Sequence, residues 1–161
     1  MAAPTPLPTT SDLLYQHAMI RAPVFALLAL AADPAFAQSP PPLDAVRITA
    51  ITSATQAERI AADQRRTSRR HTGPITLVVE ERGIGRARLL RIDGTVTTAQ
   101  ASQRPLCGAE VSAGACRPGE PVTGVEITYH LGALPSGTAI AVQDTSAVLP
   151  ARTLGAEIVL Q

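Results

Sequence analysis

The stretch VEITYHLGALPSGTAIAV, residues 125–142, indicates more about the fold than any other part of the sequence. Apolar side chains alternate with polar ones on both sides of its centre, at Val125, Ile127, Tyr129, Leu131, Ile140 and Val142. A period of two is typical of strands with one buried face. The central GALPSG segment is rich in turn-forming residues. We predict an antiparallel hairpin in which Leu131 pairs with Thr138 and Tyr129 lies opposite Ile140.

A second alternating stretch lies upstream, between residues 75 and 92. Ile75, Leu77 and Val79 alternate with polar residues, and residues 83–86 (GIGR) have the composition of a turn. If Arg82 pairs with Ala87, one register places Val79 opposite Leu90 and Glu81 opposite Arg88. We therefore predict a second hairpin with a cross-strand Glu81–Arg88 ion pair.

The remaining elements are a helix and shorter strands. Residues 55–70 lack Gly and Pro, and apolar residues recur at helical spacing at Ala54, Ala57, Ile60 and Ala61. Thr55 and Glu58 have the spacing of a capping box, and the arginines at the end suit a helix C-terminus. Residues 45–51 fit either a strand or the first turns of this helix. Residues 156–160 predict a final strand, and residues 95–99 extend the strand that ends near residue 92.

These elements predict a mainly β domain over residues 44–161. Hairpin connections imply antiparallel pairing, so we expect a small antiparallel β-sandwich or open barrel with one N-terminal helix packed on it. The 161-residue chain is 45% hydrophobic but only 2% aromatic, so its core must be aliphatic. Lys and Asn are absent, which indicates a GC-rich genome, such as that of a GC-rich bacterium.

The N-terminal region resembles an export signal in composition. Arg21 precedes an apolar run over residues 22–32, and the A-x-A pattern at residues 35–37 follows. Eleven helical residues span only about 16 Å, too short for a bilayer core of about 30 Å. We predict a signal peptide over residues 19–37 and a Pro-rich lead-in over 38–43. The alternative is a buried helix. Residues 1–18 lack Arg, so Met19 rather than Met1 is the expected start, with 1–18 a non-native or disordered extension.

The cysteine count agrees with export. Cys107 and Cys116 are the two cysteines of the chain, and an even count in an exported protein favours a disulfide. A loop this short contributes roughly 2–3 kcal/mol in the loop-entropy account. The alternative, a metal pair, needs further ligands. We expect a periplasmic or secreted protein without a transmembrane span after signal cleavage.

An arginine cluster is the most conspicuous charged feature. Arg65, Arg66, Arg69 and Arg70 lie one turn apart in pairs if residues 55–70 are helical. Guanidinium groups bind phosphates and carboxylates in bidentate fashion, so the four are candidate contacts for a polyanionic envelope component. The alternative is a solvated helix end. Nucleic acid is not expected, because the net charge of +1 is small and such proteins are usually strongly basic.

The sequence contains no motif that identifies a reaction, and we assign no catalytic residue, metal or cofactor. Without Lys there is no Walker A loop and no Schiff-base lysine. We expect a non-catalytic module of the cell envelope that is structural or binds a protein partner. The first alternative is a small exported enzyme, which requires His71 or His130 to meet a carboxylate and a hydroxyl. The second is polyanion binding by the arginine cluster.

Overall fold

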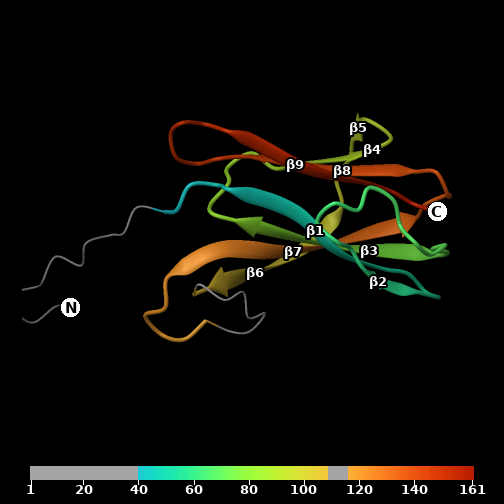
Figure 1. Ribbon diagram of the computed structural model, residues 1–161, viewed down its shortest axis with the longest axis horizontal. Helices are drawn as coiled ribbons and strands as arrows, with labels where there is room; N and C mark the ends of the chain where they lie inside the picture. The colour runs from blue at the N-terminus through green and yellow to red at the C-terminus, as the bar shows by residue number, and fades with distance from the viewer. Residues whose placement is uncertain (1–39, 109–115) are drawn as a thin grey trace, which may run out of the picture. The chain divides into compact units, whose positions relative to one another are not determined.

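The computed structural model describes residues 40–108 and 116–161, whose regular elements are nine β-strands (Figure 1). They are β1 (Ala45–Thr52), β2 (Ala57–Arg59), β3 (Pro74–Arg82), β4 (Leu89–Ile92), β5 (Thr95–Val96), β6 (Gln100–Cys107), β7 (Val122–Ala133), β8 (Ala139–Thr145) and β9 (Thr153–Val159). Five form one sheet in the order β2-β1-β3-β7-β6, and four form a second in the order β5-β4-β8-β9. Every strand pair is antiparallel, which confirms the mainly β, antiparallel prediction.

The two sheets enclose an aliphatic core. Its fully buried side chains come from the inner faces of both sheets: Ile51, Leu77, Val79, Ile127, Ile140, Val142 and Ile158. Each buried side chain of this size contributes about 1.5–3 kcal/mol. Tyr129 is the aromatic residue that packs among them, at 6% exposure. The alternation in residues 75–79 and 127–142 therefore identifies the buried face of each strand correctly.

The strand partners differ from the predicted hairpins, and both hairpin predictions are wrong. Val79 on β3 pairs with Ile48 on β1 and with Ile127 on β7, whereas Leu90 on β4 pairs with Val142 on β8. The strands on either side of residues 83–88, and those on either side of 134–138, belong to different sheets. Each connection is therefore an arch across the core. Apolar alternation shows which face of a strand is buried. The same pattern results whether two strands are neighbours in one sheet or lie in opposite sheets across the core.

The predicted helix over residues 55–70 is also wrong. Ala57–Arg59 forms β2 at the edge of the five-stranded sheet, with Thr52 opposite Ala57, and an irregular segment follows it. Among the described residues no helix forms. The helical face offered Ile60 and otherwise only alanines, of which Ala57 and Ala61 are exposed. Pairing with β1 satisfies backbone groups at no cost in buried apolar area.

The other segments are placed as follows. Residues 45–51 lie in β1, and the predicted final strand is confirmed within β9. Residues 95–96 form β5, a short hairpin partner of β4, rather than an extension of it. Pro42 bridges to Ile84 and Leu43 is buried, so the end of the Pro-rich lead-in joins the domain. The disulfide between Cys107 and Cys116 is present.

The proposed signal peptide (19–37) and the segment 1–18 lie outside the described residues. In the described part of the chain, no helix reaches the length and apolar character that crossing a membrane requires.

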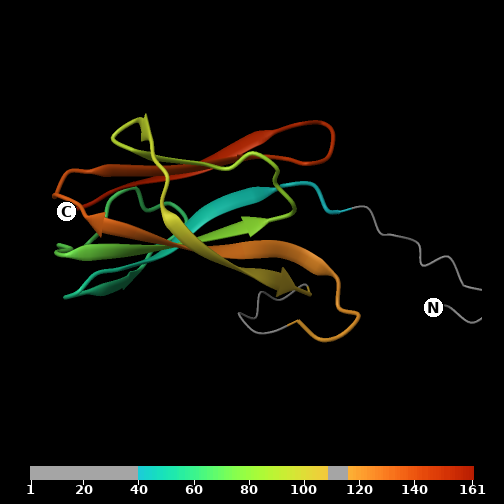
Figure 2. The ribbon, with the colours of Figure 1, turned by 180° about the vertical axis from the view of Figure 1, so that it is seen from behind.

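Figure 2 presents the sandwich from behind, with β6 at the rim of the five-stranded sheet and the chain from β5 crossing to it.

Candidate functional site

Glu58 organises the irregular segment after β2. Its carboxylate accepts hydrogen bonds from Gln64 Nε2 (2.7 Å) and from the backbone and hydroxyl of Ser68 (2.7 and 2.9 Å). The backbone N–H of Arg69 donates to it at 3.0 Å. Burial acts to raise the pKa of Glu58, but the donors from Ser68, Gln64 and Arg69 outweigh it and lower the pKa to about 2. Glu58 is therefore ionised at neutral pH.

His71 meets the carboxylate of Glu58 and the hydroxyl of Ser53. Its Nε2 lies 3.4 Å from Glu58 Oε2, and its Nδ1 lies 3.2 Å from Ser53 Oγ. The side chain of His71 is fully buried, and that of Glu58 is 6% exposed. Because an ionised carboxylate can only accept, the neutral ring carries its hydrogen on Nε2 and accepts at Nδ1. The geometric requirement stated for an enzymatic site at His71 is met.

His130 does not take part in such an arrangement. It lies on β7 opposite Thr76 and Gln100, and its side chain is exposed. The sequence indicates His71 as a candidate but not Ser53, and it predicts that Glu58 belongs to a helix cap. The Thr55–Glu58 spacing was the available signal: Glu58 does cap backbone N–H groups, but those of Ser68 and Arg69.

The four arginines do not share a helix face. The backbone of Arg65 accepts from Val159 N at 3.0 Å, and Arg66 bridges to the same residue of β9. Arg69 reaches Gln56 Oε1 with Nη1 at 3.2 Å. All four residues, Arg70 included, are exposed. The helical spacing assumed for them is wrong, while anion binding by these side chains stays a prediction.

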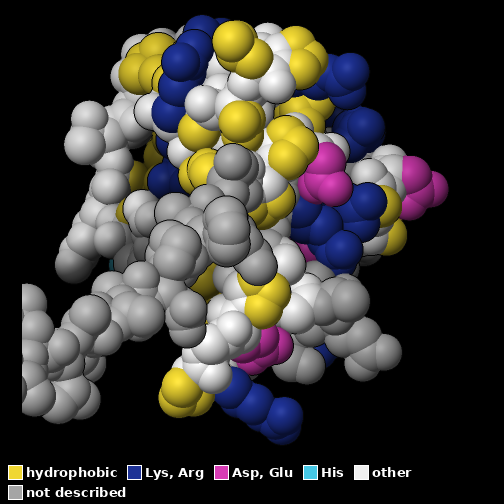
Figure 3. Space-filling model, turned by 90° about the vertical axis from the view of Figure 1, so that its left-hand side faces the viewer, with side chains coloured by type: hydrophobic (Ala, Val, Ile, Leu, Met, Phe, Trp, Pro, Cys, Tyr) yellow, Lys and Arg dark blue, Asp and Glu magenta, His cyan; other side chains and the backbone are white. Residues whose placement is uncertain are grey.

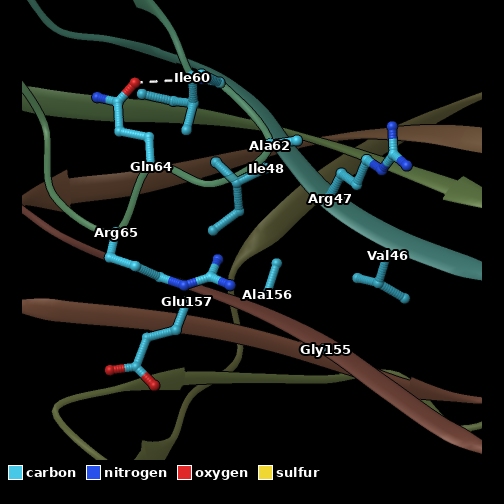
Figure 4. A pocket seen from close by; sticks show the side chains of 11 residues that line it. Val46, Arg47, Ile48, Ile60, Ala62, Gln64, Arg65, Gly155, Ala156 and Glu157 are labelled. Atoms are coloured by element: carbon cyan, nitrogen blue, oxygen red, sulfur yellow. Dashed lines mark hydrogen bonds between the residues drawn. The ribbon is translucent and has the colours of Figure 1, made fainter.

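Arg65 alone of this cluster borders a cleft between β1 and β9 (Figure 4). The cleft has a volume of about 220 Å³, and its walls include Ile48, Ala156 and Glu157. The Arg65 side chain extends across it toward Ala156, whereas Arg47 points away from its centre. One guanidinium with a nearby carboxylate is a weak site for a polyanion. Figure 3 shows one end of the molecule, where basic side chains stand in separate groups among apolar and acidic ones.

A second buried charged group lies between the sheets. Arg88 donates from Nε to Glu81 Oε1 at 2.8 Å and from Nη2 to Glu81 Oε2, and its Nη2 lies 3.8 Å from Asp144 Oδ2. The predicted Glu81–Arg88 pair is therefore present, across an arch rather than a hairpin. The side chains of Glu81 and Asp144 are 0% and 1% exposed. A Cβ at Gly85 would collide with the Asp144 carboxylate, so this cluster requires glycine there.

The charges of this cluster influence each other. Burial raises the pKa of Glu81 against the opposing effect of Arg88, and the nearby Asp144 raises it further. The hydrogen bond to Glu81 raises the pKa of Arg88. Burial also raises the pKa of Tyr129, to about 12. Two buried carboxylates thus share one guanidinium.

Among the strands of more than three residues, β6 is the most exposed. Its residues 100–105 are all exposed, and β7 is its single neighbouring strand in the described part of the chain. Pro105 is tolerated in a sheet where its missing N–H would face outward. Because backbone direction alternates along a strand, Ala101 and Gln103 present their N–H groups on the same outward side.

A groove runs beside this edge, between β6 and the β4–β5 hairpin. It measures about 390 Å³, and its lining includes Leu89, Val96, Thr97, Ala101, Gln103 and Tyr129. Leu89 and Val96 are 40% and 58% exposed, high values for large apolar side chains. Ala101 and Gln103 pair with the buried Tyr129 and Ile127, so they lie on the inner face. β5 is only two residues long and leaves this inner face uncovered.

In the described part of the chain, His, Cys, Asp and Glu side chains form no group of three that could hold a metal ion.

The fold and its features define a disulfide-containing antiparallel β-sandwich with an exposed edge at β6. The comparison with protein families identifies it further. Residues 35–160 match the family described as "Domain of unknown function (DUF4879)", and the chain belongs to this family. Neither curated proteins nor solved structures gave a match.

Proposed function

We propose that this protein is an exported binding module of the cell envelope and that β6 receives an extended segment of a partner protein. The observation that carries the proposal is the run of six exposed residues at the edge of the five-stranded sheet. An extended peptide can add to such an edge as a further strand, with affinity from main-chain hydrogen bonds and specificity from side-chain contacts.

The adjoining groove supports an extended peptide as the occupant. A strand added beside β6 would place alternate side chains over the groove, where Leu89 and Val96 offer apolar surface and Thr97 and Gln103 offer polar groups. We therefore expect a partner segment that alternates apolar and polar residues. Pro105 and the charged Arg104 restrict the docking register to the first part of β6, because both discourage indiscriminate edge pairing.

A pair of substitutions at one position tests the role of the β6 backbone. Gln103→Pro removes an outward N–H, whereas Gln103→Ala removes the side chain and keeps the N–H. A photo-crosslinking residue at Ser102 would be used to trap partners in the native envelope fraction, and mass spectrometry would identify them. We expect Gln103→Ala to keep the crosslinked protein, at a reduced yield because one polar contact in the groove is lost, and Gln103→Pro to abolish it. Equal crosslinking by both variants would overturn docking at this edge, as would crosslinking to a second copy of this chain alone.

The export part of the proposal has its own measurement. The Cys107–Cys116 disulfide supports an oxidising compartment, because such bonds are rare in the cytosol. The intact mass of the protein from fractionated native cells, with and without reductant, is the test. We expect a chain that begins at Gln38 and gains two hydrogens on reduction. A full-length chain with two free thiols in the cytoplasm would contradict export.

A further inference from the structure

We propose that Ser53, His71 and Glu58 form a nucleophilic site that hydrolyses small esters through an acyl intermediate on Ser53. This activity goes beyond peptide binding at β6 and uses a different part of the molecule. Ser53 lies in the turn between β1 and β2, Glu58 lies on β2, and His71 lies just before β3. The inference rests on the two contacts of His71 and on what each partner can do chemically.

Glu58 holds the histidine in one tautomer. Its carboxylate is fixed by Gln64, Ser68 and Arg69 before it meets His71. Only the Nε2–H of a neutral ring can donate to it, which leaves the lone pair on Nδ1. The backbone N–H of His71 donates to Gln161 O at 3.2 Å, so the backbone that carries the ring is held in place as well. This is the role that the acidic member has in Ser-His-acid sites, which are recognised by geometry and not by ring position.

Ser53 is placed to give its proton to His71. The backbone N–H of Gln56 donates to Ser53 Oγ at 3.2 Å, which uses one lone pair of that oxygen. The hydroxyl hydrogen then has His71 Nδ1 at 3.2 Å as its best acceptor, because Gln56 O and Thr55 Oγ1 are both 3.5 Å away. A serine hydroxyl is a weak nucleophile until such a base activates it.

The surroundings favour a small substrate. Ser53 is partly exposed in its turn, while the His71 ring beneath it is completely buried. The hydroxyls of Thr55 and Thr72, 3.0 Å apart and exposed, flank the turn. Gly73 has φ +80°, and a Cβ there would lie 3.2 Å from that of Ala54, so glycine keeps this rim open. Because Ser53 is partly exposed, we expect a short acyl ester to approach it from solvent.

The reaction balances with water as the only co-reactant. Ser53 Oγ bonds to the ester carbonyl carbon as its proton passes to His71 Nδ1, and the bond from that carbon to the leaving oxygen breaks. The departing alcohol takes the proton from His71. Water then attacks the acyl-serine and gives one proton to His71. The Ser53–acyl bond breaks, the carboxylic acid departs, and the serine regains its proton. His71 acts as base and then as acid in each half.

A fluorophosphonate probe tests the nucleophile directly. It forms an Oγ–P bond with an activated serine and releases fluoride, and the adduct is located by peptide mass. We expect labelling of the folded, disulfide-bonded protein at Ser53 and its loss in Ser53→Ala. Ser136→Ala is the matched control, because Ser136 is an exposed serine in the turn between β7 and β8. It should label at the wild-type rate.

The contribution of His71 separates activation from simple exposure. We expect His71→Gln to slow labelling about 100-fold or more, since general-base assistance is typically worth 10²–10⁴. The wild-type labelling rate should be lower in acid, because a protonated His71 ring cannot accept the serine proton. Glu58 is an ionisable side chain in contact with the ring, and because its pKa is about 2 it stays charged at mildly acidic and neutral pH. The pH dependence is measured on the wild-type protein, so it tests the proposal even if His71→Gln misfolds.

Three results would overturn the proposal. The first is no adduct at Ser53, the second is equal labelling rates in wild type and folded His71→Gln, and the third is a labelling rate that does not change with pH. Failure here leaves peptide docking untouched, because Gln103→Pro and Gln103→Ala alter the opposite rim of the five-stranded sheet.

Discussion

Two glutamates with almost no exposed surface have opposite pKa shifts. Glu58 sits among hydrogen-bond donors of an irregular segment, and its pKa falls to about 2. Glu81 sits between the sheets with Arg88 as its cation and Asp144 as a competing anion, and its pKa rises. Burial acts in the same direction on both. The number and kind of donors therefore decide the charge state, and a single guanidinium shared by two carboxylates does less than several converging N–H and O–H groups.

The largest effect is expected where a buried carboxylate would lose the guanidinium that it contacts. Arg88→Ala leaves Glu81 and Asp144 buried without their guanidinium, which should lower the free energy of unfolding by about 3–5 kcal/mol. Arg82→Ala breaks the more exposed Arg82–Glu80 pair and is the control, with an expected loss below about 1 kcal/mol. Urea denaturation measures both. Equal losses would show that the interior pair has no special weight.

Glu58→Gln should come next in size. The amide keeps one acceptor oxygen and brings an NH₂ group against the donors from Ser68 and Arg69. Hydrogen bonds to a charged acceptor are worth roughly 1.5–3 kcal/mol, so we expect a loss of about 2–3 kcal/mol. Glu157→Gln changes an exposed residue of β9 and should alter the free energy of unfolding by no more than about 0.5 kcal/mol. If both variants unfold at the wild-type urea concentration, the loop does not depend on the Glu58 charge.

The pH dependence separates the two glutamates further. Because the pKa of Glu58 is lowered from 4.5 to about 2, its stabilisation is complete above 4.5 and is lost as pH falls through 2. The stability gap between wild type and Glu58→Gln should thus narrow in acid, by up to about 1.4 kcal/mol per pH unit. Glu81 acts in the other direction: its raised pKa stabilises at low pH and costs stability as pH rises. A gap that stays constant from pH 5 to pH 2 would contradict the assignment to Glu58.

The smallest effect is expected from removing one donor. Gln64→Ala deletes the 2.7 Å hydrogen bond to Glu58 Oε1 but leaves the donors from Ser68 and Arg69. The loss should be about 0.5–1.5 kcal/mol. An NMR titration of the Glu58 carboxyl should show a higher pKa than in the wild type. An unchanged pKa would mean that the side-chain amide plays no part in holding the charge.

Sequence reasoning identified local features and missed long-range ones. It found the buried faces of β3, β7 and β8, the aliphatic core, the disulfide pair and the contact between Glu81 and Arg88. It missed the strand partners, because apolar alternation does not distinguish neighbours in a sheet from faces across a core. It predicted a helix where β2 forms, since the small alanines there fit either structure.

The candidate sites followed the same rule. His71 stood out by its chemistry, but its partners could not be read from the sequence, because Ser53 in the turn after β1 and Glu58 on β2 meet it only in the folded chain. Four neighbouring arginines would form a cluster on one face of a helix, but they do not share a face in the irregular segment that follows β2. The exposed edge at β6 could not be located without the order of the strands.

The two arches also set the order in which the molecule can assemble. Val79 pairs with Ile127 in one sheet. In the other sheet, Leu90 pairs with Val142 and can do so only once that residue is present. Pairing of β3 with β7 and of β4 with β8 requires most of the chain to be present, because long loops must close first. Folding of antiparallel sandwiches on this plan takes milliseconds to seconds. A chain that crosses a membrane unfolded would thus have time to emerge before its sheets close.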